Sequence, residues 1–174
     1  TGPSLSRLKP KIQETALALW TLYLVLTILE FGLLITIGKL DWFDSLNHAL
    51  TTMPTGGFST YDASIGHFES YTVELIIIFF MFIAGLNFTL LWFIREGQFK
   101  KATQDEEFKN YLVYILTTFL FITIALLATR DYTTAASFID SLFHVVSIGT
   151  STGYASTDYM QWPVFTHLLL FVLM

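Results

Sequence analysis

Two short segments rich in glycine, threonine and serine contain residue types suited to binding a cation through main-chain oxygen atoms. They read TGGFST (residues 55–60) and STGYAS (residues 151–156). Because glycine lacks a Cβ atom, it lets backbone carbonyl groups face a common axis without a clash. Nearby hydroxyl groups can support or replace those carbonyls, and rings of such oxygens replace the water shell of an ion in channel filters. We predict that both segments line an ion filter.

Gly57 and Gly153 are the strongest candidates for filter residues. The residues beside them would offer further carbonyl groups around the same ion: Thr55, Gly56 and Phe58 in the first segment, and Ser151, Thr152 and Tyr154 in the second. Phe58 and Tyr154 are also bulky enough to wedge each segment against its surroundings. Pro54 fixes its own φ angle and has no amide hydrogen, so we expect it to shape the bend before the first segment.

Both segments belong to a longer internal repeat. FDSLNHALTTMPTGGFSTYD (43–62) aligns with IDSLFHVVSIGTSTGYASTD (139–158), with six identical positions at a constant spacing of 96 residues. Each copy lies between one long apolar stretch that would lead outward and another that would lead back. Two crossings per copy keep both copies in the same orientation, so we interpret them as parallel repeats about an axis along the membrane normal.

Short apolar stretches precede both segments, at about residues 42–53 and 138–148. Each is too short to span a membrane and too apolar to lie in water. We predict half-helices that dip into the membrane and return as extended backbone, which is tolerated at that depth only where it lines a cavity or is buried in protein. Asp41 and Asp44 suit the N-terminal end of the first half-helix, so its partially negative C-terminal end would point to the membrane centre and favour a cation.

The composition indicates a membrane protein. Of the 174 residues, 53% are hydrophobic and 13% are charged, and the mean hydropathy is +0.59. The absence of cysteine excludes disulfides and cysteine-ligated metals. Stretches at about 16–37, 71–94 and 111–128 are long and apolar enough to cross a bilayer, and a fourth begins near residue 163. No small-residue cleavage site follows the first stretch, so we predict no removable signal peptide.

Basic residues predict the orientation of the spans. Seven of the nine lysines and arginines precede the first span or flank the connection between the second and third, so this side is predicted to be cytoplasmic. The opposite side carries only Lys39 and Arg130. It also carries eight acidic residues, namely Asp41, Asp44, Asp62, Glu69, Glu74, Asp131, Asp140 and Asp158. Such an outer face would concentrate cations.

The predicted fold is therefore an all-α membrane protein with tandem span–re-entrant pore helix–span repeats. Its parts are a cytoplasmic N-terminal segment (1–13), a first pore repeat (14–94, with a pore helix at 42–53 and a filter at 54–60), a cytoplasmic loop (95–109) and a second pore repeat (110–174, with a pore helix at 138–148, a filter at 149–156 and a truncated last span).

Other polar residues in the apolar regions have competing interpretations. Asp44, Ser45 and His48 mimic part of a hydrolytic triad and recur in the second copy, but they lie along one short helix. We favour packed, hydrogen-bonded histidines at positions 48 and 144 over catalytic ones. Glu30 is an intramembrane carboxylate in the first span, and such residues are functional candidates. It either pairs with a backbone amide behind the half-helix, a structural role that we favour, or attracts cations.

The sequences HALTTMPTGGFSTYDASIGHF and FHVVSIGTSTGYASTDYMQWP closely resemble the second and third pore repeats of the Trk/Ktr/HKT superfamily, in particular its bacterial Trk-type potassium-uptake membrane subunits. The resemblance covers nearly the whole chain, and both repeats match in order and spacing. It implies four such repeats in one polypeptide, arranged like a tetrameric potassium channel. Each repeat would contribute one filter segment with a key glycine, and Gly57 and Gly153 match those glycines.

The resemblance also implies partners and a location. These are the remaining pore repeats of the same polypeptide, a homodimer, a cytosolic nucleotide-binding regulatory subunit and the lipid of a bacterial inner membrane that the protein crosses several times. Potassium would bind at the filter residues, with no organic cofactor and no nucleic acid partner.

We therefore expect potassium uptake without covalent chemistry, so the protein would not be an enzyme. One alternative is a sodium-selective or non-selective monovalent cation pore of the same architecture. A water pore is disfavoured by the parallel repeats and the acidic outer face. An intramembrane enzyme using Asp44, Ser45 and His48, or a scaffold whose repeats only pack, remain as further alternatives.

Overall fold

The computed structural model describes residues 5–95, 97–129 and 133–174, and every regular element within them is a helix. In chain order these are α1 (Leu5–Thr36), α2 (Trp42–Thr52), the 3₁₀ helix η1 (Ser64–Phe68), α3 (Tyr71–Ala84), α4 (Phe88–Arg95), α5 (Phe99–Gln104), α6 (Glu106–Thr129), α7 (Thr134–Gly149), the 3₁₀ helix η2 (Tyr159–Gln161) and α8 (Val164–Leu173).

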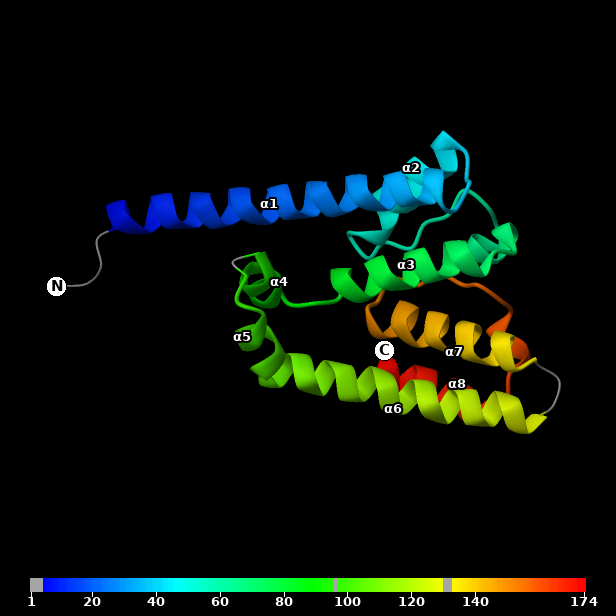
Figure 1. Ribbon diagram of the computed structural model, residues 1–174. Coiled ribbons are helices and arrows are strands. Elements are labelled where there is room, and N and C mark those ends of the chain that lie inside the picture. Colours follow the sequence, from blue (N-terminus) through cyan, green and yellow to red (C-terminus); the bar gives the residue numbers. More distant parts are fainter. Residues whose placement is uncertain (1–4, 96, 130–132) are drawn as a thin grey trace.

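The helices form two units with the same order of elements. In the first unit, the short helix α2 packs against α1 and α3, and in the second, α7 packs against α6 and α8. A 3₁₀ turn follows the short helix in each unit. The units are joined through α3, which also packs along α7, so that α1, α3, α7 and α6 lie in successive layers (Figure 1).

The outer surfaces of the long helices are strongly apolar. Two helical segments, Ala16–Thr36 and Glu106–Thr129, are long and apolar enough to cross a membrane. Along α1, large side chains such as Leu17 and Trp20 are 69% and 72% exposed. Soluble proteins rarely expose continuous apolar surface of this kind, whereas lipid tails cover it without cost.

The second predicted span is interrupted, so its prediction as one helix over residues 71–94 is wrong. The 14-residue helix α3 ends at Ala84, and α4 turns out of line with it (Figure 1). A glycine stands at the break and lets the chain pass close to the second repeat, because a Cβ atom on Gly85 would lie 2.6 Å from Thr150 Cγ2 and 2.8 Å from the Tyr111 hydroxyl. The Asn87 side chain then donates to Glu107 at 2.9 Å, which ties the break to α6.

Three other helices begin at residues that differ from the predicted ones. Helix α1 begins at Leu5, inside the segment predicted as cytoplasmic. Helix α6 begins at Glu106 because the Asp105 carboxylate accepts from backbone amides of its first turn, at 3.0 and 3.1 Å. Helix α7 begins at Thr134, earlier than the predicted residue 138, after an N-cap by Thr133.

One continuous apolar core holds the two units together. It contains buried residues from both, among them Leu34, Ile77 and Met81 in the first and Phe143, Val146 and Tyr154 in the second. Tyr154 belongs to the predicted filter, so the core reaches the segments whose chemistry the sequence singled out.

Candidate ion filter between the two repeats

The chain after α2 folds back so that its amides face the helix it has just left. Thr55 N donates to Thr52 O at 2.9 Å. The amides of Gly56 and Gly57 both donate to Thr51 O, at 2.8 and 3.2 Å. These bonds satisfy carbonyl groups at the C-terminal end of α2, which have no partner inside the helix.

The second repeat makes the same three bonds 96 residues later. Ser151 N donates to Ile148 O at 2.9 Å, and the amides of Thr152 and Gly153 donate to Ser147 O at 2.8 and 3.2 Å. The duplicated sequence therefore encodes a duplicated turn. This turn geometry does not require a proline, because Thr150 occupies the position equivalent to Pro54 in the second repeat.

Backbone conformation alternates along both turns. Thr55 and Gly57 have φ angles of +53° and +63°, and their counterparts Ser151 and Gly153 have +59° and +87°. The residue between each pair does not have a positive φ. Left-handed backbone is unusual for threonine and serine, and such conformations cluster at functional sites.

The carbonyl oxygens of residues 55–57 and 151–153 have no donor among the residues that the structure describes. All six corresponding amides are bound, as set out above. Except for the buried Thr152, these residues are half-buried or exposed, so their oxygens are open to water or to another partner. A set of acceptors without donors, following two pore helices that contain no lysine or arginine, fits a cation.

The two turns meet. A Cβ atom placed on Gly57 would collide with the Thr152 carbonyl oxygen and would lie 3.2 Å from the Gly153 carbonyl carbon. Gly57 is therefore needed both for its positive φ and for this close approach. The two bends therefore lie side by side.

Tyr154 wedges the second turn against the first repeat. Its side chain is only 2% exposed, and its hydroxyl lies 2.6 Å from Thr51 Oγ1 and 3.3 Å from His48 O. Phe58, at the equivalent position, is 75% exposed. The predicted wedge is thus confirmed for Tyr154 and wrong for Phe58 within this chain, because no repeat lies on that side of Phe58 in the described residues.

Two hydroxyl groups that we did not single out from the sequence hold the ends of the turns. Thr51 Oγ1 donates to Phe58 O at 2.8 Å, and Ser147 Oγ donates to Tyr154 O at 2.7 Å. The Phe58 and Tyr154 carbonyls, which we predicted to face the ion, thus accept hydrogen bonds from their own pore helices, and we assign these two residues as anchors of the filter. The alignment of the two repeats contained evidence for this role, since Thr51 and Ser147 are hydroxyl residues at equivalent positions, 96 residues apart.

Two of the predicted outer acids also serve as anchors. Asp44 accepts from Thr60 Oγ1 at 2.7 Å and from the Tyr61 hydroxyl at 2.9 Å, and the bond to Asp44 raises the pKa of Tyr61. Asp140 accepts from Ser156 at 3.1 Å. These carboxylates tie the outer ends of the turns to the pore helices and are not free surface charges.

The two histidines are packed and hydrogen-bonded, as we favoured from the sequence. His48 Nδ1 lies 2.7 Å from Asp44 O and its Nε2 lies 2.9 Å from Ser59 Oγ. His144 Nδ1 lies 2.9 Å from Asp140 O, but Ala155 replaces the serine, and His144 Nε2 has no partner in the described part of the chain. The buried Ser45 hydroxyl makes no hydrogen bond to His48, so the pair lacks the geometry of a nucleophile and its base.

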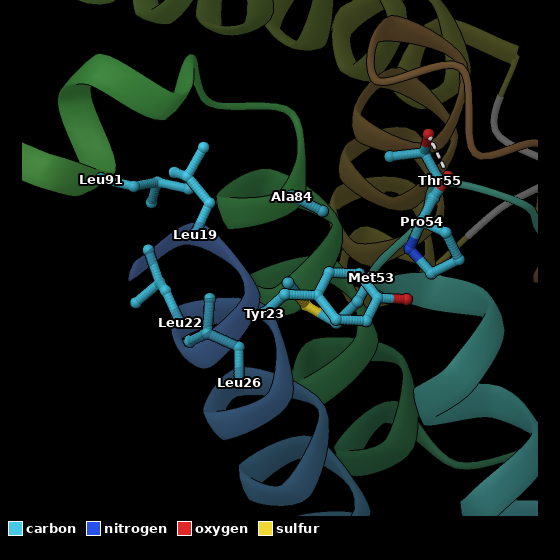
Figure 2. A pocket seen from close by; sticks show the side chains of 9 residues that line it. All are labelled: Leu19, Leu22, Tyr23, Leu26, Met53, Pro54, Thr55, Ala84 and Leu91. Carbon is cyan, nitrogen blue, oxygen red and sulfur yellow. Dashed lines mark hydrogen bonds between the residues drawn. The ribbon is translucent and has the colours of Figure 1, made fainter. Parts of the chain in front are cut away.

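A mainly aliphatic cavity of about 220 Å³ borders the first turn on its predicted cytoplasmic side (Figure 2). Pro54 and Thr55 reach it from the turn, Tyr23 from α1 and Ala84 from the end of α3. Apolar surface therefore begins directly on the predicted cytoplasmic side of the polar turn.

These features define the class: an all-helical membrane protein built from tandem pore repeats whose re-entrant turns meet. The chain belongs to the TrkH family, because the family model described as "Cation transport protein" matches residues 6–174.

Similar proteins carry potassium-uptake names. The chain is 38% identical over 170 residues to the Trk system potassium uptake protein TrkH of Halomonas elongata, which covers 96% of this chain and 35% of that protein. It is 35% identical over 167 residues to TrkH of Escherichia coli, covering 95% and 34%. The crystal structure of the potassium transporter TrkH from Vibrio parahaemolyticus superposes with a TM-score of 0.87 at 37% identity, covering 94% of this chain and 36% of that one. The chain thus spans about a third of the length of these relatives.

Proposed function

We propose that this chain supplies two walls of a potassium-uptake pore and that the carbonyl oxygens of residues 55–57 and 151–153 replace water around the ion. The proposal rests on one observation that holds in both turns. The backbone amides donate to carbonyl groups of the pore helices, whereas the backbone carbonyl oxygens have no donor among the described residues. The potassium-uptake names of the TrkH relatives support potassium as the ion.

The pore helices contribute electrostatics as well as support. Each ends at its turn, and the C-terminal end of a helix carries partial negative charge. An ion would arrive from the acidic outer face, lose water between Gly57 and Gly153 and continue down its electrochemical gradient. The protein forms no covalent bond with the ion, so it acts as a transporter and not as an enzyme.

The rest of the functional assembly lies outside this chain. We propose that further pore repeats of the same polypeptide complete the ring, with the repeat boundaries predicted from the sequence (14–94 and 110–174). Multi-pass insertion in a bacterial inner membrane, a homodimer and a cytosolic nucleotide-binding regulatory subunit complete the proposal.

Growth of a bacterium that lacks its own potassium uptake tests this function. Gly153→Ser in the full-length polypeptide places a side chain where nothing lies within 4 Å but φ is +87°. Left-handed strain of about 1–3 kcal/mol should distort the filter and raise the potassium concentration needed for half-maximal growth by about tenfold.

Gly32→Ala is the matched control, because Gly32 lies on α1 and nothing is within 4 Å of its added Cβ. A potassium requirement and sodium tolerance that stay unchanged in Gly153→Ser would contradict the filter assignment. A pore that conducts sodium as well as potassium before any substitution would favour the non-selective alternative.

A further inference from the structure

The Glu30 carboxyl group of α1 lies deep inside the protein, behind the first pore helix. Its side chain is 0% exposed, and neither carboxyl oxygen has a hydrogen-bond partner among the described residues. Buried polar groups are nearly always bound, so an orphaned one needs an explanation.

The Glu30 carboxyl faces the junction of the two repeats. The Thr52 side chain adjoins it, and the carboxyl lies within electrostatic range of the Tyr154 phenol. Tyr154 in turn lies 2.6 Å from Thr51 Oγ1 and 3.4 Å from Thr52 Oγ1. We name this group of Thr51, Thr52 and Tyr154 the junction cluster.

The junction cluster controls both filter turns. Thr51 O accepts the amides of Gly56 and Gly57, and Thr52 O accepts the amide of Thr55. Tyr154 itself belongs to the second turn. A side chain that holds this cluster therefore acts on both sets of carbonyl groups at once.

The surroundings of Glu30 favour the neutral acid. The helices packed most extensively against α1 are α2 and α3, and the charged residues of these two helices are the acids Asp44 and Glu74. His48 on α2 has both ring nitrogens bound, to Asp44 O and to Ser59. An ionised carboxylate without a cationic partner would cost several kcal/mol in such a site, next to the negative end of a helix. A neutral carboxyl group has an O–H donor, which an ionised one lacks.

We propose that Glu30 is a positioning residue: as a neutral acid its carboxyl group, which has no partner among the described residues, closes onto the adjoining Thr52 as a hydrogen-bond donor in the assembled pore, and so holds the junction cluster and both filter turns in place. This inference rests on the proposed filter function. This positioning role differs from two other roles: an ionised Glu30 that attracts cations directly, and a Glu30 side chain that only fills space.

Two substitutions of similar volume separate these roles. Glu30→Gln keeps a neutral donor, so the ratio of rubidium to sodium uptake by the full-length polypeptide should stay within about twofold of the unsubstituted value. Glu30→Met fills the space without any donor, and the ratio should fall by about tenfold, as expected for the loss of a buried hydrogen bond of 1–2 kcal/mol. Uptake is measured in cells and normalised to the amount of protein in the membrane.

Each outcome decides between the roles. A tenfold loss in Glu30→Gln would overturn the proposal in favour of a required charge. An unchanged ratio in Glu30→Met would overturn it in favour of packing alone. Tyr154→Phe, which removes only the phenol hydroxyl, should lower the rubidium-to-sodium ratio to a similar extent. A normal ratio in Tyr154→Phe would overturn the proposal, even if the Glu30→Met protein reached the membrane in too small an amount to be assayed.

The same assay separates this inference from the function on which it rests. Gly153→Ser is included as a marker of the filter. If it lowers the ratio while Glu30→Met does not, the role of Glu30 is wrong and the filter stands. If Gly153→Ser leaves the ratio unchanged, the filter itself is wrong. Glu69→Gln, at an exposed carboxylate of the outer loop, controls for the loss of one acidic residue.

Discussion

Gly57→Ala is expected to destabilise the protein by about 2–5 kcal/mol, which combines left-handed strain with overpacking. The added methyl group meets the Thr152 carbonyl oxygen, and the φ of +63° is unfavourable for alanine. Gly153→Ala shares the strain, at φ +87°, but nothing lies within 4 Å of its added Cβ. Its cost should therefore be smaller, about 1–2 kcal/mol.

The comparison of the two alanine variants is the informative measurement. The apparent melting temperature of the purified full-length polypeptide in detergent should fall further for Gly57→Ala than for Gly153→Ala. Gly32→Ala should leave it unchanged or raise it slightly, because alanine is the better helix former. Equal melting temperatures for Gly57→Ala and Gly153→Ala would show that the two turns are not in contact.

Tyr154→Ala should cost about 3–5 kcal/mol, the range for removing a fully buried aromatic side chain. Beyond the cavity, it removes the hydroxyl that lies 2.6 Å from Thr51 Oγ1 and so disconnects the second filter turn from the first pore helix. We expect a large fall in apparent melting temperature and loss of selective uptake.

Tyr154→Phe is the matched variant, because it keeps the ring and removes the hydroxyl alone. Its stability should fall by about 1 kcal/mol, the usual net contribution of one hydrogen bond. A melting temperature for Tyr154→Ala as high as that of Tyr154→Phe would mean that the ring does not pack between the repeats.

The internal repeat made much of this fold predictable. A spacing of 96 residues placed the two short helices, the two turns and their glycines in equivalent positions, and the structure repeats even the lengths of the amide hydrogen bonds. Apolar stretches of sufficient length also located α1 and α6. These features depend on local pattern, which a single sequence displays directly.

The features that were missed depend on contacts between distant residues. At the break after Ala84, Gly85 lies close to Thr150 and Tyr111 of the other repeat, and hydropathy does not report such proximity. Phe58 and Tyr154 occupy equivalent positions, yet only Tyr154 has a neighbouring repeat to pack against. Asp44 looked like a surface charge until its partners Thr60 and Tyr61 were located.

The most direct test of the central claim is the position of the ion itself. The structure of the full-length polypeptide should be determined in rubidium, whose anomalous scattering identifies it, and compared with one determined in sodium. We expect rubidium density between the carbonyl oxygens of residues 55–57 and those of residues 151–153. Rubidium bound elsewhere along the pore, with those oxygens turned to protein donors, would contradict the account.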